Sequence, residues 1–383
     1  MASTKKIVDI DIATRVIGDE EDIFIIRPGQ DFTLYADFRK KGVAFLDFPD
    51  LDLLLFKSKW ENEKQREAVL RSSTIRDWHL TGRSKDQQPS RAHSDYEGRA
   101  KGMRLGAHVA SVKRFYLELP VGTIIVVPGP GYFSDVLVGQ LSSKVISQKD
   151  IGLYRGEVVP ARRVDWLGQK QKSEFSEEAI ARLQNQKPII ALDRSLRKEF
   201  IPVAFDQYVF EGVFSSKFLT TELDFSTLDD FNFQAFTNYV AGVLVASREL
   251  DMPHENVTMS EALEALHRYR DLIPELATNI NSPGFLRLSS EQVYPLVIAA
   301  IFSLALAAGA SAQSANVRVH NSSALQEDPC AIKVEKHVEA AMSLMGTDEW
   351  RAACKNALRV SKSAGLKSSV KAQKREAVDD DGS

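Results

Sequence analysis

The stretch VGTIIVVPGPG, residues 121–131, joins a run of β-branched residues to a turn of prolines and glycines. A run of this kind predicts a β-strand that ends in a tight reversal. Further short apolar segments are separated by turn residues, at 22–26, 32–36, 42–46, 136–140, 153–158 and 162–167. Their order and length predict a small curved β-barrel in residues 1–195.

The apolar period changes after about residue 195 from two to near 3.6, which predicts helices. Thr258 and Glu261 form a capping box at the start of one of them. We therefore expect an α+β protein in which the barrel domain is followed by a linker at 196–225 and a mainly α-helical domain at 226–360. One short strand is expected at 316–320, and the Lys- and Ser-rich residues 361–383 are expected to be a disordered tail.

Length and composition favour an ordinary globular protein with two domains, since 383 residues exceed the usual size of one hydrophobic core. The only two cysteines, Cys330 and Cys354, are too few for a disulfide framework. The first residues mix charges of both signs and contain no apolar run, so no secretory signal is expected. These features favour a cytoplasmic protein.

An almost unbroken apolar segment, residues 293–310, approaches the length of a membrane span. It is rich in alanine and lacks the flanking basic cluster of a spanning helix. A helix buried in the core is therefore favoured over a membrane helix. An effector or homo-oligomerisation role through this helix remains an alternative, as does a partner protein bound by the helical domain.

The compact motifs of common enzymes are absent from the sequence, including phosphate-binding loops, zinc-protease helices and nucleophile elbows. A metal-dependent nuclease is an alternative, because its carboxylates and lysine need no rigid spacing. Its candidate residues are Glu327, Asp328, Lys333 and Glu335. The dispersed histidines give no metal-ligand spacing, so neither a metal nor a cofactor is expected, and no catalytic residue is identified.

Positive charge is concentrated between Lys57 and Arg114. Fourteen lysines and arginines stand there against seven aspartates and glutamates, a net charge of +7, whereas the whole chain carries -3. Residues 79–108 are poor in large apolar residues and predict a long basic loop. Such a loop could contact a nucleic-acid backbone, or be only a solvated surface. The candidate backbone residues are Arg83, Lys85, Arg91, Arg99, Lys101 and Arg104.

Several short motifs follow one another in residues 22–195. They are FIIRPG at 24–29, Phe38, GVAF at 42–45 and Asp50-Leu51, followed by Phe115, VGTIIV at 121–126, Val138-Gly139, GEV at 156–158 and RRVDWL at 162–167. Their order resembles that in the EVE-like and restriction-endonuclease amino-terminal domains of the PUA superfamily. The resemblance spans residues 22–195. It departs from the family where Asp47-Phe48 replaces a Gly-Trp pair and where Thr123 replaces the turn aspartate.

The resemblance implies a barrel whose concave face accepts a nucleobase, often modified or flipped, in a defence system against foreign DNA. Such a pocket needs an aromatic plane for stacking and polar groups for the base edge. The candidate base-binding residues are Arg27, Tyr35, Phe48, Trp78 and Trp166. Tyr35 and Trp166 fit core packing equally well. We expect a nucleic-acid-binding sensor, with DNA favoured over RNA as its partner.

Overall fold

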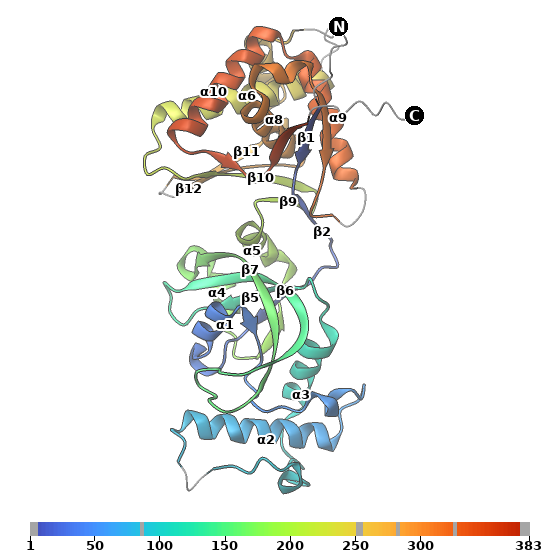
Figure 1. Cartoon of the computed structure of the whole chain (residues 1–383), viewed down its shortest axis with the longest axis vertical. Coiled ribbons are helices and arrows are strands. Elements are labelled where there is room, and N and C mark those ends of the chain that lie inside the picture. The colour runs from blue at the N-terminus through green and yellow to red at the C-terminus, as the bar shows by residue number, and fades with distance from the viewer. Residues whose placement is uncertain (1–6, 85–87, 250–255, 281–283, 325–327, 376–383) are drawn as a thin grey trace. The chain divides into compact units, whose positions relative to one another are not determined.

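The computed structural model describes residues 7–84, 88–249, 256–280, 284–324 and 328–375 and shows a mixed α+β protein (Figure 1). The chain forms two compact units. We call Glu20–Phe205 the half-barrel unit and call Met1–Asp19 together with Asp206–Ser383 the composite unit. Each unit has its own hydrophobic core, as is usual for a chain of this length.

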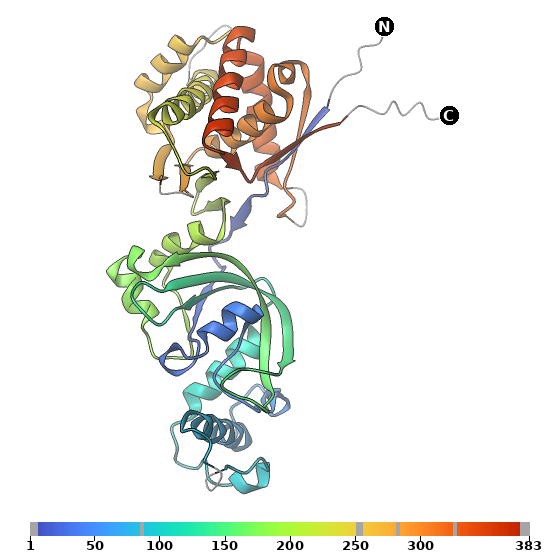
Figure 2. The ribbon, with the colours of Figure 1, turned by 60° about the vertical axis from the view of Figure 1, so that its left-hand side comes forward.

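The half-barrel unit is built on a six-stranded sheet, which is curled (Figure 2). The strand order is β4-β7-β6-β5-β3-β8. The strands are β3 (Ile23–Ile26), β4 (Val43–Ala44), β5 (Ile124–Pro128), β6 (Asp135–Gln148), β7 (Val159–Gln171) and β8 (Ile189–Ala191). Two register shifts between β6 and β7, at Val138/Gly139 and Leu141/Val145, bend this hairpin. Gly139 permits the close approach, because a Cβ there would lie 2.6 Å from Val164 Cγ1.

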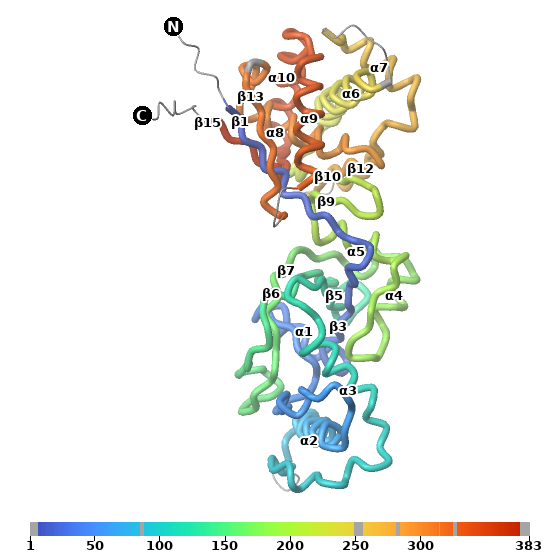
Figure 3. Tube along the Cα trace, turned by 90° about the vertical axis from the view of Figure 1, so that its right-hand side faces the viewer, coloured from blue at the N-terminus to red at the C-terminus, as the bar shows by residue number. Residues whose placement is uncertain are grey.

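Five helices surround this sheet within the described residues: α1 (Tyr35–Lys41), α2 (Glu63–Leu80), α3 (Gly106–Lys113), α4 (Glu177–Leu183) and α5 (Arg197–Ala204). A capping box between Asn62 and Gln65 begins α2. Helix α3 lies beside α2 and continues into a π-turn at Arg114–Glu118 (Figure 3). The large core cluster of the unit is formed by the sheet together with α1, α2 and α3.

Two strands expected from the sequence of this unit are absent. Residues 32–36 instead belong to a 3₁₀ turn, Gln30–Phe32, and to the start of α1, because Gly29, Asp31 and Phe32 have positive φ and cannot extend a strand. Residues 153–158 form turns, in which Glu157 N donates to Tyr154 O at 3.0 Å. The expected loop 79–108 is also shorter, since α2 reaches Leu80 and α3 begins at Gly106.

The composite unit is larger than the expected helical domain 226–360, because it also contains β-sheets built in part from residues outside that range. Its helices are α6 (Thr227–Glu249), α7 (Met259–Arg268), α8 (Tyr294–Ala308), α9 (Pro329–Leu344) and α10 (Thr347–Ser363). They pack with two sheets, whose strand orders are β11-β12-β10-β9-β2, with β14 paired to β10, and β13-β1-β15. The strands are β1 (Ile7–Asp11), β2 (Arg15–Ile17), β9 (Gln207–Phe210), β10 (Val213–Thr220), β11 (Glu275–Asn279), β12 (Gly284–Ser290), β13 (Asn316–His320), β14 (Lys367–Ser368) and β15 (Lys371–Arg375).

The amino-terminal strand explains why the boundary is not where we placed it. Strand β1 lies between β13 and β15, and its Val8 and Ile10 are completely buried in the composite core. The expected linker 196–225 instead contains α5 of one unit and β9 and β10 of the other. The expected tail is ordered as far as Arg375, while residues 376–383 lie outside the described residues.

The apolar segment 293–310 forms α8, the central helix of the composite core. Among the described residues, α8 and the 3₁₀ turn after it, Tyr294–Gln313, are the one helical stretch long and apolar enough to cross a membrane, and 72% of its apolar window is buried. Phe302 packs edge-on against Phe218 and Phe236 at centroid distances of 5.4 and 5.5 Å. These contacts are those of a core helix.

Candidate functional site

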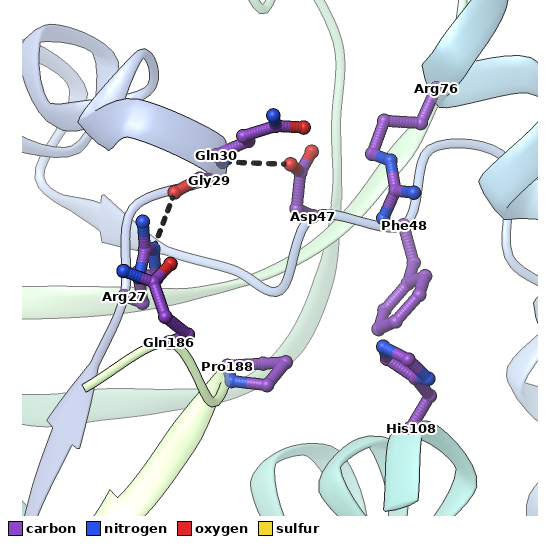
Figure 4. A pocket seen from close by; sticks show the side chains of 9 residues that line it. All are labelled: Arg27, Gly29, Gln30, Asp47, Phe48, Arg76, His108, Gln186 and Pro188. Carbon is purple, nitrogen blue, oxygen red and sulfur yellow. Dashed lines mark hydrogen bonds between the residues drawn. The ribbon is translucent and has the colours of Figure 1, made fainter. Parts of the chain in front are cut away.

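A small pocket opens in the half-barrel unit where five segments meet (Figure 4). They are the turn after β3, the segment after β4, the facing sides of α2 and α3, and the loop before β8. The lining residues are Arg27, Gly29, Gln30, Asp47, Phe48, Arg76, His108, Gln186 and Pro188. The cavity measures about 160 Å³, below the ~300–1,000 Å³ of pockets that enclose drug-sized ligands. It therefore suits one small ring system.

The turn after β3 forms one wall through an unusual backbone. Gly29 has φ +75°, and a Cβ there would lie 2.9 Å from Leu34 Cδ1, so this position requires glycine. Asp31 and Phe32 follow with φ of 50° and 59°. Sparsely populated conformations of this kind collect at binding sites, where surrounding contacts hold them. Here they direct the amide of Gln30 toward the pocket, where it donates to Asp47 Oδ2 at 3.3 Å.

Arg27 is a structural clamp at the back of this turn. Its side chain is buried, with Nε donating to Gly29 O at 3.2 Å and Nη1 to Asn185 O at 3.3 Å. Its guanidinium also lies 5.0 Å from the centroid of the Phe32 ring. Arg27 thus lines the pocket as expected, but its hydrogen bonds hold the turn and the loop before β8 together.

Asp47 supplies the carboxylate of the pocket. The hydroxyl of Tyr154 donates to its Oδ1, while the Gln30 amide reaches its Oδ2. Burial raises the pKa of Asp47, an effect that the hydrogen bond from Tyr154 and the charge of Arg76 partly offset. The chain therefore holds a desolvated hydrogen-bond acceptor at the pocket wall, where it costs folding free energy.

Phe48 and His108 form the aromatic corner. Phe48 is buried, and the His108 ring stands edge-on to it with centroids 5.7 Å apart. Burial and the nearby guanidinium of Arg76 lower the pKa of His108, so its imidazole is neutral at pH 7. Its Nδ1 is buried and has no hydrogen-bond partner. An unsatisfied buried atom of this kind shows that the hydrogen bonding of this corner is incomplete.

Tyr116 fixes the two halves of this corner relative to each other. It lies in the π-turn after α3, where its hydroxyl donates to Pro160 O at 2.8 Å and accepts from Leu46 N at 3.0 Å. Leu46 directly precedes Asp47 and Phe48. Arg162, also buried, donates to the carbonyls of Phe115 and Leu119 around the same turn. The pocket residues are therefore held by a second layer of buried hydrogen bonds.

A larger groove of about 630 Å³ continues from the pocket along α3. The two cavities share His108, Gln186 and Pro188. Small residues of α3 form the groove wall, together with cations from both sides. These lining residues are Ala107, Ala110, Ser111, Lys113, Arg114, Glu118, Lys187 and Ile189. Three cationic side chains thus stand against the single carboxylate of Glu118.

Three of the expected base-binding residues do not line the pocket. The Tyr35 hydroxyl donates to Asp135 O at 2.9 Å, and burial raises its pKa to about 12. Trp166 Nε1 donates to Phe38 O at 3.3 Å, which places the indole against α1. Trp78 Nε1 donates to Ser84 O at 2.8 Å. These rings serve the packing of the unit, and of the five expected residues only Arg27 and Phe48 reach the pocket.

The expected backbone-contacting arginines are mostly engaged within the protein. Arg83 donates to His79 Nδ1 at 3.0 Å and to Leu153 O at 3.1 Å. Arg91 pairs with Glu157 and lies 5.5 Å from the Trp78 centroid. Arg99 Nη1 donates to Asp95 O at 3.2 Å. Lys101 and Arg104 are exposed, and Lys85 lies outside the described residues.

The three alternative nuclease residues that the structure describes, Asp328, Lys333 and Glu335, do not assemble a metal site. Asp328 caps α9 through Cys330 N at 2.9 Å and accepts from Asn321 Nδ2 at 2.6 Å. Glu335 accepts from Val319 N at 2.6 Å, and Lys333 lies over the Phe214 ring. Glu327 is not among the described residues. In the parts of the chain that the structure describes, no group of three or more His, Cys, Asp or Glu side chains could hold a metal ion.

Seven of the nine lining residues were not predicted from the sequence, among them Asp47, Arg76, His108 and Gln186. Asp47 was noted only as a departure from the family pattern. Its neighbour Phe48, a predicted base-binding residue, could have pointed to it. Arg76, His108 and Gln186 come from separate segments that only the tertiary fold brings together. Comparisons of the chain with protein-family models, curated proteins and solved structures find no match, so the function is inferred from the site itself.

Proposed function

We propose that the half-barrel unit binds nucleic acid by accepting one unstacked nucleobase in the pocket and the adjoining backbone in the groove. The observation that carries this proposal is that the two cavities share His108, Gln186 and Pro188 in their linings. A pocket for a single ring therefore adjoins a groove lined by three cations. A nucleotide strand complements this arrangement, because each planar base is attached to a negatively charged phosphate backbone.

The pocket chemistry suits the edge and face of a base. Phe48 and Pro188 supply apolar surface for the ring, in place of the stacking that an extruded base loses. Asp47 presents carboxylate oxygens to ring or exocyclic N–H groups, and the imidazole of His108 adds a second polar ring to the pocket lining. A carboxylate that accepts from a base amino group is a standard element of base readout.

The groove chemistry suits the phosphates. The bound strand would leave the pocket past three cations of the groove, which are Lys113, Arg114 and Lys187. The small side chains of Ala107, Ala110 and Ser111 leave room for its sugar. This local charge matters because counterion release depends on cations near the phosphates, not on the net charge of the protein. The nucleic-acid backbone is therefore proposed to contact α3 and not the loop 79–108. Defence against foreign DNA is the biological role that the family resemblance suggests.

The test is fluorescence-anisotropy binding of the full chain to short labelled strands of DNA and RNA, with ordinary and modified bases, over a salt series. We expect affinity to fall with salt and to fall further in the Asp47→Asn and His108→Ala variants. The matched controls are Asp95→Asn and His93→Ala, the same changes at exposed positions of the 3₁₀ turn His93–Tyr96. The absence of binding at low salt, or equal binding by pocket and control variants, would overturn the proposal.

A further inference from the structure

Trp60 is the most exposed tryptophan of the protein, at 76% of its full accessible surface. The other three have structural roles: Trp350 is completely buried, while Trp78 and Trp166 are partly buried and hydrogen-bonded through Nε1. A tryptophan left this open to water loses the benefit of burying its large apolar ring. Neither the pocket nor the core of the half-barrel unit accounts for it.

The position of Trp60 is fixed by helix α3. Lys113 Nζ, at the end of α3, donates to Lys59 O at 3.1 Å. At the other end, a Cβ on Gly106 would lie 3.1 Å from Glu61 Oε2. Glu61 is itself held by Arg66 at 3.1 Å. The segment Lys59–Glu61 therefore runs antiparallel to α3.

Lys113 connects this segment to the groove, because the same side chain lines the groove and bonds the residue before Trp60. His108, at the junction of pocket and groove, lies five positions earlier on α3, or about 7.5 Å along the helix axis. Trp60 thus lies at the end of a path that starts in the pocket. The cations Lys113, Arg114 and Lys187 line the groove along this path.

The chemistry at Trp60 is that of a stacking platform. Lys59 Nζ lies 5.8 Å from the ring centroid, which places a positive charge beside an open aromatic face. Proteins that bind single strands combine such exposed aromatic planes with a cationic track for the backbone. Every base offers a face for stacking, so this contact needs no particular sequence.

We propose that Trp60 stacks on a second base of the strand whose first base occupies the pocket. The ligand is then a single-stranded or locally unpaired nucleic acid of several nucleotides, and neither a free nucleoside nor an intact duplex. This inference rests on the proposed function and adds to it a second contact and a class of ligand.

The experiment uses the full chain and measures both binding and intrinsic tryptophan fluorescence with single-stranded oligonucleotides of increasing length. We expect longer strands to quench the fluorescence and to bind more tightly than a mononucleotide. Trp60→Phe should remove the quenching while retaining most of the affinity. Trp60→Ala should weaken binding of the longer strands on the order of 10-fold and leave mononucleotide binding unchanged.

The matched control is Phe133→Ala, which removes another aromatic ring, 74% exposed, from the turn between β5 and β6. It should change neither signal. Strands that bind in an Asp47-dependent manner, with no quenching and no effect of Trp60→Ala, would overturn this inference and leave the base pocket intact. Failure of every strand to bind at low salt would instead overturn the proposed function, and this inference with it.

Discussion

The ring of His108 stands at 87° to the ring of Phe48, with the two centroids 5.7 Å apart. One ring comes from α3 and the other from the segment after β4, far earlier in the chain. The buried Nδ1 of His108 has no hydrogen-bond partner. The corner is therefore packed but incompletely hydrogen-bonded, which is uncommon for a buried polar atom.

The charge state of this corner should depend on Arg76. Burial lowers the pKa of His108, and the guanidinium of Arg76 lowers it further. We expect Arg76→Gln to raise the pKa of His108 toward its ordinary value, because the nearby positive charge is removed. NMR titration of the histidine ring protons measures this shift, with His108→Gln used to assign the signal.

His79 is the internal control for this titration. Burial also lowers its pKa, but its charged neighbours are Glu157, Arg83 and Arg91. Its titration should therefore remain in place when Arg76 is changed. An unmoved His108 signal in Arg76→Gln would show that burial alone sets the pKa of the corner.

Asp47→Asn should reveal the stability cost of the pocket carboxylate. Because the folded-state pKa of Asp47 is raised, the protonated form favours folding, and this contribution is lost as pH rises from the ordinary value of 3.8 through the raised value. Asparagine does not ionise. The unfolding free energy of the variant minus that of the parent should therefore increase with pH over this interval and then level off.

Urea unfolding at a series of pH values measures this difference. The control is Asp95→Asn, at an exposed position of the same unit. A difference that stays constant with pH would show that Asp47 ionises in the folded protein as easily as in the unfolded chain.

The groove cations should determine the salt dependence of binding. Arg114→Gln and Lys187→Gln should each reduce the slope of log affinity against log salt by about 0.7 for every single-strand phosphate that the protein ceases to neutralise. The exposed pair Lys101→Gln and Arg104→Gln removes equal charge from outside the lining of either cavity. Equal slope changes in both pairs would indicate a diffuse electrostatic interaction and not a groove.

Arg91, which the sequence suggested as a backbone contact, should behave as a structural residue. Its guanidinium pairs with Glu157, which is also hydrogen-bonded to His79 at 3.2 Å. We expect Arg91→Ala to reduce stability by about 1–3 kcal/mol, the usual cost of losing a charge-assisted hydrogen bond, with an unchanged salt slope. Thermal unfolding measures this loss of stability. The control variant is Arg99→Ala, because Arg99 is more exposed. A reduced slope of log affinity against log salt, without loss of stability, would show instead that Arg91 contacts the nucleic-acid backbone.

The sequence predicted those elements whose signals are local. The strand Asn316–His320 and the capping box of Thr258 and Glu261 are both confirmed. Each depends on residues within a few positions of one another, so periodicity and side-chain capping are sufficient to identify them. The apolar run 293–310 likewise predicted the buried helix α8, because a helix that is apolar on all sides must be enclosed.

The errors share a physical cause, which is the pairing of distant segments. Strand β1 is short and polar at alternate positions, and it becomes a central strand only when β13 and β15 lie on either side of it. Strand β15 looks like a disordered tail because Lys371–Arg375 is mostly charged. His108 likewise has no local feature of a binding residue, since its neighbours in the site come from four other segments.

The burial of α8 leads to the last prediction. Phe302 is completely buried and packs edge-on against Phe218 and Phe236. Phe302→Ala should reduce the unfolding free energy of the composite unit by about 3–5 kcal/mol, since it removes a large side chain and leaves a cavity. Leu228→Ala, at a residue of α6 that is 65% exposed, should change it by less than about 0.5 kcal/mol.

Chemical denaturation without detergent measures both values. If α8 is the core of this unit, the Phe302 variant unfolds at lower denaturant concentration and its parent needs no lipid to fold. If α8 instead serves a membrane or a partner, the free chain would tolerate Phe302→Ala with little loss of stability. Its aromatic contacts would then form only in the bound state. The two edge-on rings around Phe302 favour the first outcome, because such pairs add about 0.5–1.5 kcal/mol beyond the burial of area alone.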